Sequence, residues 1–182
     1  HDPYKQYYDH ILENSSAMFP LGTDQLGRCV LSRLMYAGKT SLLTVFAIVI
    51  VSALIGSFIG IISAMSGGIV DSIIMRFLDM LMAFPGMVLI IALVAVFGVG
   101  VFNIFIALIV TSWVSYARFT RSVSMSIIGS DFIHEARLGG ANNFKIMYAY
   151  ILPNILPQML VLMTQDLGDK LLTLASLSLL GL

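Results

Sequence analysis

Ionisable side chains lie inside a largely apolar stretch near the C-terminus, where a charge is costly. The stretch contains Gln165, Asp166, Asp169 and Lys170. Asp166 and Lys170 are four residues apart, so on a helix they share a face and can form a simple ion pair. The alternative is that Asp166 or Asp169 lines a pathway and attracts a cation, either a metal complex or the amino end of a peptide. The sequence leaves both interpretations open.

Residues that commonly bind metals or act as nucleophiles are few and scattered. His1 and His10 lie in the N-terminal segment and His134 in a later loop, with no ligand spacing between them. The single cysteine, Cys29, excludes an internal disulfide framework and a cysteine-based metal cluster, and we interpret it as a small buried apolar residue. We therefore expect no metal site and no cofactor bound by this chain.

The composition predicts a protein that lies in a lipid bilayer. Of its 182 residues, 58% are hydrophobic and 11% are charged, and the mean hydropathy is +0.94. Soluble domains carry about a quarter charged residues because water must wet their surface. The net charge is zero, so no overall field favours a nucleic-acid partner.

Long runs without Asp, Glu, Lys or Arg predict the membrane spans. One run has 31 residues between Lys39 and Asp71, and another has 38 between Asp79 and Arg118. About 20 apolar residues cross a bilayer core, so the second run has room for two spans. A soluble protein with a large core would need polar helix faces, which the first run lacks. The predicted fold is an all-α, polytopic integral membrane bundle with spans at about Ser41–Met65, Arg76–Phe97, Val101–Tyr116 and Ile155–Leu182.

Alternation of these spans divides the chain between two sides of the membrane. Residues 1–40 are predicted to be an extracytoplasmic segment, and 41–182 a transmembrane core with a cytoplasmic loop over 118–150. The positive-inside rule favours this orientation, by five basic residues to four. The cytoplasmic set is Arg76, Arg118, Arg121, Arg137 and Lys145, and the other set is Lys5, Arg28, Arg33 and Lys39.

Two features inside the spans predict how they pack and bend. Small residues recur every four positions in the first span, at Ser52, Gly56, Gly60 and Ala64. Such a stripe lets another helix backbone approach closely, and we expect a sister helix or a partner subunit there. In the second span, Pro85 and the glycine after it predict a kink, which would suit a helix that lines a pathway.

The longest polar loop, Asp131–Asn154, predicts a helix–turn–helix outside the bilayer. We expect Asp131 to cap a short helix that continues through His134–Leu138 and ends at Gly139-Gly140. A second helix is predicted from about Phe144. Its exposed face would mix charged and apolar residues, which is typical of a protein contact.

This loop resembles the E-A-A cytoplasmic loop of ATP-binding-cassette (ABC) importer permeases. With the terminal L-P of that pattern placed on Leu152 and Pro153, its E-A-A falls on His134, Glu135 and Ala136, and its glycine on Gly140. His134 therefore stands where the family has its first glutamate. The resemblance implies an ATPase-coupling site at His134, Glu135, Ala136, Arg137, Gly139, Gly140, Ala141, Leu152 and Pro153.

Further segments resemble the dipeptide, oligopeptide and nickel permeases, in the family's order, over nearly everything from Phe19 onward. The tripeptide Asp166-Leu167-Gly168 resembles the nickel branch. The other similar segments are Phe19–Arg28, Val70-Asp71, Arg76–Asp79 running to Ala83–Pro85, Tyr116–Arg118 with Arg121, and Leu177–Leu182.

The resemblance implies a non-catalytic subunit of an importer in a prokaryotic cell membrane. Its partners would be a second permease, two cytoplasmic ATPases that bind ATP, and an extracytoplasmic substrate-binding protein. The family also has one span before residue 1 and one after Leu182, so we expect this chain to be a fragment of a longer protein.

Two alternatives to a permease remain, a membrane-embedded enzyme and a non-transporting scaffold. An intramembrane protease needs a Ser–His pair or two facing aspartates within its spans. No predicted span contains histidine, and Asp166 and Asp169 lie on one helix beside a lysine. A scaffold would not explain the organised helix pair of the loop.

Overall fold

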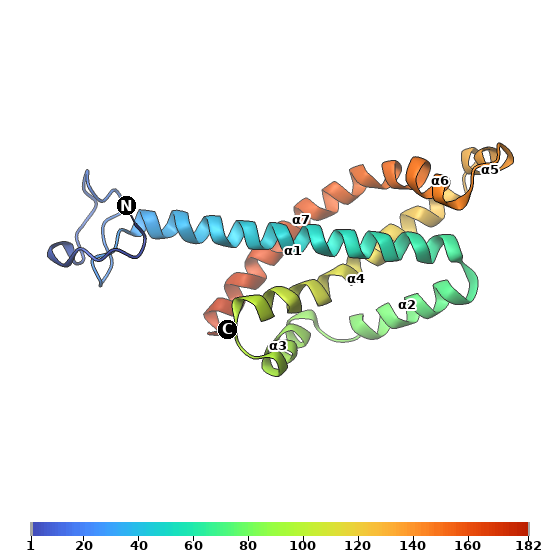
Figure 1. The fold of residues 1–182 in the computed structure, drawn as a ribbon. Helices are drawn as coiled ribbons and strands as arrows, with labels where there is room; N and C mark the ends of the chain where they lie inside the picture. The colour runs from blue at the N-terminus through green and yellow to red at the C-terminus, as the bar shows by residue number, and fades with distance from the viewer. Residues whose placement is uncertain (1, 182) are drawn as a thin grey trace. The chain divides into compact units, whose positions relative to one another are not determined.

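A computed structural model describes residues 2–181. The chain divides into two compact units, residues 1–44 and 45–182, and the boundary between them falls within the first long helix. The described residues form helices and no β-strand, apart from one isolated bridge between Thr23 and Cys29. The elements are a 3-10 turn at Tyr8–His10, α1 (Val30–Ser66), α2 (Gly68–Met82), α3 (Gly86–Phe97), α4 (Val101–Ile128), α5 (Asp131–Leu138), α6 (Asn143–Ile146), a π-helical turn at Met147–Ile151, and α7 (Leu152–Leu179) (Figure 1).

The N-terminal unit is ordered around the carboxylate of Asp24. This carboxylate accepts hydrogen bonds from the backbone N–H groups of Leu26 and Arg28, and it forms ion pairs with the guanidinium groups of Arg28 and Arg33. Partial burial opposes ionisation, but these donors outweigh it and hold the pKa of Asp24 well below its ordinary value. These contacts hold the turn at Asp24–Arg28 against Arg33, in the first turn of α1.

Three single helices are long and apolar enough to cross a membrane, and a bent pair brings the number of candidate spans in the described residues to four. The expected all-α, polytopic architecture is confirmed. Two of the helices extend beyond the predicted spans. The first helix begins at Val30 and not at Ser41, and α4 continues past Tyr116 to Ile128. Charged side chains do not end a helix when they are paired or can reach water.

The second predicted span, Arg76–Phe97, is two helices. The axes of α2 and α3 meet at 85° across a short break before Gly86 (Figure 1). Proline lacks a backbone N–H and disfavours helical geometry in the residue before it. Pro85 therefore stands just outside α3, and its carbonyl accepts the first turn's hydrogen bond from Leu89. The kink predicted at Pro85 is confirmed, and it is a complete break.

Within residues 45–182, the small-residue stripe of α1 lies against α4. Ser52, Gly56, Gly60 and Ala64 are all buried. A methyl group added at Gly56 would lie 2.5 Å from the carbonyl oxygen of Trp113. One added at Gly60 would overlap the carbonyl of Ala117. The sister helix that the stripe admits is thus part of the same chain.

Different elements lie at the two ends of the unit formed by residues 45–182. Figure 1 shows α5 and α6 at the same end as the turn between α1 and α2, with α3 and the last turns of α7 at the other end. This placement agrees with the predicted alternation of spans. Ile90, Val94, Ile104 and Leu108 form a buried apolar cluster that joins α3 to α4.

The close approach of α1 to α4 predicts that Gly60→Ala destabilises the protein. The new methyl group must push apart two backbones, and overpacking of this kind costs about 1–3 kcal/mol. The free energy of unfolding, measured by denaturant titration in detergent micelles, should fall by that amount.

Gly38→Ala is the matched control, because Gly38 is also in α1 but has no atom within 4 Å of the added methyl group. It should leave stability unchanged or raise it by up to about 1 kcal/mol through helix propensity. Equal effects of the two substitutions would contradict the close packing of α1 on α4.

Candidate functional site

The loop between α4 and α7 folds as a helix pair. The N-cap of α5 is Ser130, so the expected capping role of Asp131 is wrong. Asp131 instead occupies the first turn, where its negative charge interacts favourably with the positive end of the helix dipole. Gly139 ends the helix, and Gly140 turns the chain with a φ of +82°. Asn142 then caps α6 by accepting a hydrogen bond from the backbone N–H of Lys145 at 2.8 Å.

The helix pair has one buried side and one open side. Ile133 of α5 and Ile146 of α6 are completely buried, whereas Leu138 and Phe144 are 89% and 71% exposed. The residues on which the family pattern falls lie mainly on the open side. His134, Glu135, Arg137, Gly139 and Gly140 are exposed, and Ala136 and Ala141 are half-buried. This open surface combines both charges with large apolar groups, as protein-binding surfaces do.

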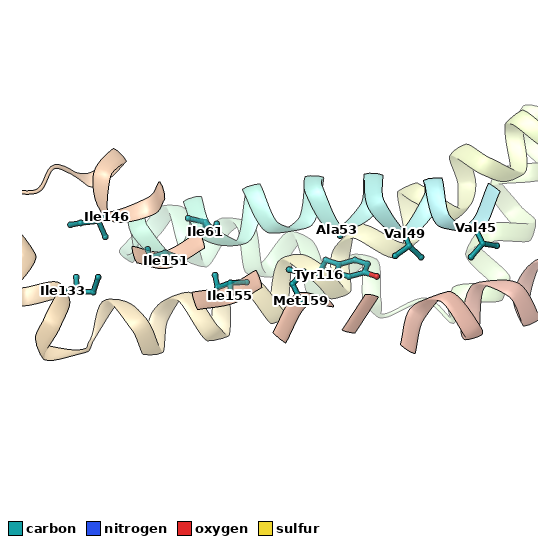
Figure 2. Packing of buried hydrophobic residues seen from close by; sticks show 10 residues of the cluster. All are labelled: Val45, Val49, Ala53, Ile61, Tyr116, Ile133, Ile146, Ile151, Ile155 and Met159. Atoms are coloured by element: carbon teal, nitrogen blue, oxygen red, sulfur yellow. The ribbon is translucent and has the colours of Figure 1, made fainter. Parts of the chain in front are cut away.

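A continuous apolar cluster connects the buried side of the loop to the spans. Ile133 and Ile146 belong to one cluster with Ile151 of the π-helical turn and with Ile155 and Met159 of α7 (Figure 2). The same cluster continues to α4 and α1 through Tyr116, Ile61, Ala53, Val49 and Val45. Because close-packed side chains resist compression, this cluster is a stiff connection between the loop and α7 and α4.

The second helix of the loop passes into α7 through an irregular turn. The backbone N–H of Leu152 donates to the carbonyl of Met147, five residues earlier, as in a π-helix. Pro153 has no N–H to donate, and the side chain of Asn154 donates to the carbonyl of Tyr150 at 2.7 Å. Leu152 is half-buried and Pro153 is exposed. The turn therefore joins the loop to α7 without a break in the helical backbone.

Two ion pairs between α2 and α4 were not predicted from the sequence. The guanidinium of Arg121 binds both oxygens of Asp71, with 2.5 Å between Arg121 Nε and Asp71 Oδ1, and the hydroxyl of Ser63 in α1 donates to the same Oδ1 at 2.6 Å. Arg118 pairs with Asp79 on a more exposed surface. The two aspartates of α2 are eight residues apart and the two arginines of α4 are three apart, so each set lies on one face of its helix. This spacing was the signal in the sequence from which the pairs could have been predicted.

The charges in α7 separate into a paired set and an open one. Lys170 Nζ lies 3.2 Å from Asp166 Oδ1, and the hydroxyl of buried Tyr116 donates to Asp166 Oδ2 at 2.9 Å. Gln165 and Asp169 are exposed, and neither side chain has a bonding partner in the part of the chain that the structure describes. Of the two interpretations left open by the sequence, the ion pair is present for Asp166, and Asp169 is outside it.

Pro85 lines a cavity of about 350 Å³ at the break between α2 and α3. Its walls are mainly apolar, with the hydroxyls of Thr111 and Ser115 on the α4 side. Across residues 2–181, no group of three or more His, Cys, Asp or Glu side chains is arranged to hold a metal ion. Cys29 is buried and has a free thiol.

Comparison with known sequences gives a family match over most of the unit just described. Residues 56–182 match the family described as "Binding-protein-dependent transport system inner membrane component". The chain is 35% identical, over its whole length, to the di/tripeptide transport system permease protein of Pseudomonas aeruginosa.

Two other relatives have different names. The chain is 39% identical over 89% of its length to the nickel transport system permease protein of Escherichia coli. It is 37% identical over 96% of its length to the glutathione transport system permease protein of Pectobacterium atrosepticum. The chain spans about three fifths of the length of these relatives, which it covers to 62%, 58% and 58%.

The partly buried pair of Asp71 and Arg121 predicts a strong effect when one partner is removed. Arg121→Ala leaves a carboxylate without its cation, so the free energy of unfolding should fall by about 3–5 kcal/mol. The more exposed pair is the control, and Arg118→Ala should cost about 1 kcal/mol or less.

The double substitution Asp71→Ala with Arg121→Ala distinguishes an unpaired charge from lost packing. It should be less destabilising than Arg121→Ala alone, because no charge remains without a partner. A double variant as unstable as the sum of the two single ones would contradict the interaction between these side chains.

Proposed function

Because the chain belongs to the binding-protein-dependent transport system inner membrane components, we propose that it is the permease subunit of an ABC importer. It is a multi-pass membrane protein with its helices arranged as described above. In the proposed importer it lies in a prokaryotic cell membrane and forms half of the translocation pathway. A second permease, different from this one, forms the other half.

The observation that carries this proposal is the apolar cluster between the loop and the spans. The open surface of α5 and α6 has the character of a protein contact, and the cluster behind it reaches α7, α4 and α1. We propose that a cytoplasmic ATPase binds this surface. Movement of the ATPase then displaces the loop, and the packed isoleucines transmit the displacement to the helices.

In the proposed importer, the partner subunits carry out the chemical steps. Two cytoplasmic ATPases bind and hydrolyse ATP, and this chain is non-catalytic. The side chains of the coupling loop hold the ATPase in register and move no proton or phosphate. An extracytoplasmic binding protein delivers the cargo and makes most of the selection between substrates.

The relatives' names refer to di/tripeptides, nickel and glutathione. For this chain we propose a cargo of di- or oligopeptides, or of nickel or other metal complexes. The residues predicted from the sequence to line the pathway are Pro85, Asp166, Asp169 and Lys170. Asp166 and Lys170 neutralise one another, and Tyr116 holds the pair against α4. The pair therefore orders α7, whereas Asp169 and the cavity beside Pro85 remain open to cargo.

The coupling role predicts that Gly140→Asp stops transport without unfolding the protein. Gly140 is exposed, and an added Cβ would meet no atom within 4 Å. Its φ of +82° is left-handed, a region in which Asp is among the better-tolerated residues. The new charge and bulk should weaken the ATPase contact by at least about 1.4 kcal/mol, which is tenfold in affinity. Co-purification of the ATPase and ATP-driven uptake measure this loss.

Gly68→Asp is the matched control for that substitution. Gly68 also has a positive φ and open space around its Cβ. It is the first residue of α2 and lies outside the loop, and the turn between α1 and α2 is at the same end of residues 45–182 as α5 and α6 (Figure 1). It should retain uptake within about twofold. Normal ATPase assembly and uptake by Gly140→Asp would refute the proposed docking role of the loop.

A further inference from the structure

One face of α7 carries exposed polar side chains from Asn154 to Asp169. Asn154, Gln158, Gln165 and Asp169 are exposed and follow one another at steps of four, seven and four residues. At about 100° per residue, these steps place all four side chains within about 60° of one another. Val161 and Leu172 fall in the same sector, so the face is mixed in composition but has one charge.

The hydrogen-bonding groups of this face are largely unused inside the chain. The hydroxyls of α7 at Thr164, Thr173 and Ser176 donate to carbonyls of the helix itself. In contrast, no hydrogen bond or ion pair within residues 2–181 uses the side chains of Gln158, Gln165 or Asp169. Amide and carboxylate groups in a bilayer need water or a polar partner, because hydrocarbon provides neither.

In the N-terminal half of α7, the side opposite the polar face is exposed and suited to lipid. It presents Leu156 and Leu160, which are 49% and 58% exposed. A third side, with Ile155, Met159 and Leu177, is buried in the chain. The first turns of the helix therefore have one side for the protein core, one for lipid and one for a polar surrounding. Further along, Leu167, Leu171 and Leu174 pack against the core on the side of Leu156 and Leu160. Close packing on another helix is served by the glycines of α1, whereas this polar face has long side chains.

We propose that the α7 face of Asn154, Gln158, Gln165 and Asp169 lines a water-filled pathway, and that Asp169 is its charge-selective residue. Asp166 has Lys170 as its counter-ion, so Asp169 is the carboxylate of α7 left to act on cargo. The cargo it favours carries a positive group, either a peptide ammonium or a divalent metal ion. This inference rests on the proposed transport function and adds the residue that distinguishes cargo by charge.

Thiol chemistry tests the pathway without knowledge of the cargo. Gln165→Cys and Leu160→Cys are each introduced into the Cys29→Ala chain, and the transporter is assembled with partner subunits that lack reactive cysteines. Each complex is treated with trimethylammonioethyl methanethiosulfonate (cationic) or sulfonatoethyl methanethiosulfonate (anionic). Thiolates react only where water reaches them, so Gln165→Cys should react at least about tenfold faster than Leu160→Cys.

The charge of Asp169 is tested in the Gln165→Cys complex. Asp169→Asn should lower the ratio of cationic to anionic modification rates by about tenfold, because a charge one helical turn away acts on the two reagents in opposite directions. Asp169→Glu should retain the ratio. An unchanged ratio with Asp169→Asn overturns the charge-selective role. A Gln165→Cys thiol that reacts in the isolated subunit but not in the complex shows that the partner permease covers this face, and this overturns the pathway.

Uptake then identifies which cation is the cargo. Cells take up labelled nickel chloride or labelled dialanine through the wild-type, Asp169→Asn and Asp169→Glu transporters. Uptake of whichever compound is carried should fall several-fold with Asp169→Asn and recover with Asp169→Glu. Normal uptake by Asp169→Asn overturns the inference and leaves the proposed function intact. A wild-type complex that binds no ATPase and carries neither compound refutes the proposed function, and the thiol rates still decide whether the face is wet and negatively charged.

Discussion

The fold depends on the rule that a charge in or near the bilayer must have a counter-ion or water. Three ion pairs satisfy this rule. Two of them join different helices, and the third, between Asp166 and Lys170, lies along α7. Asp71 and Arg121 join α2 to α4, and Ser63 adds α1 to the same carboxylate. Asp79 and Arg118 repeat the α2–α4 contact about two turns further along α2 and about one turn back along α4. Because a pair with one member missing is much more costly than no pair, these contacts also fix the register of the helices.

The pairs have a mechanical consequence for the loop. Helix α4 carries Arg118 and Arg121 toward its C-terminal end, and α5 follows after two residues. The broken pair α2–α3 is therefore tied to the same helix that leads into the loop of α5 and α6. On the other side, the buried isoleucines connect that loop to α7. In the proposed importer, a force on α5 would reach both the break beside Pro85 and the polar face of α7, through ion pairs in one case and apolar packing in the other.

Sequence reasoning found what depends on local rules and missed what depends on pairing over distance. Hydropathy located the apolar helices, Pro85 marked the break, and Gly139-Gly140 marked the turn between α5 and α6. The helices extend beyond the predicted spans because a charge-free run marks the apolar part of a helix and not its ends. Whether Arg118 or Lys39 ends a helix depends on its partner or on its reach to water, which hydropathy does not encode. The partner of the small-residue stripe was likewise ambiguous, since glycine spacing gives the close approach but not the chain that makes it.

The departure of the loop from the family pattern has a structural explanation. The first E-A-A position, His134, and the second, Glu135, are both exposed on α5, so the acidic group remains on the open surface one residue later. A shift of one residue turns a side chain by about 100° around the helix, whereas the buried contact at Ile133 is unaffected. The packed side of the loop can therefore keep its geometry while the open side changes its charge pattern. Such a division lets the proposed contact with an ATPase vary in sequence while the connection to the spans is preserved.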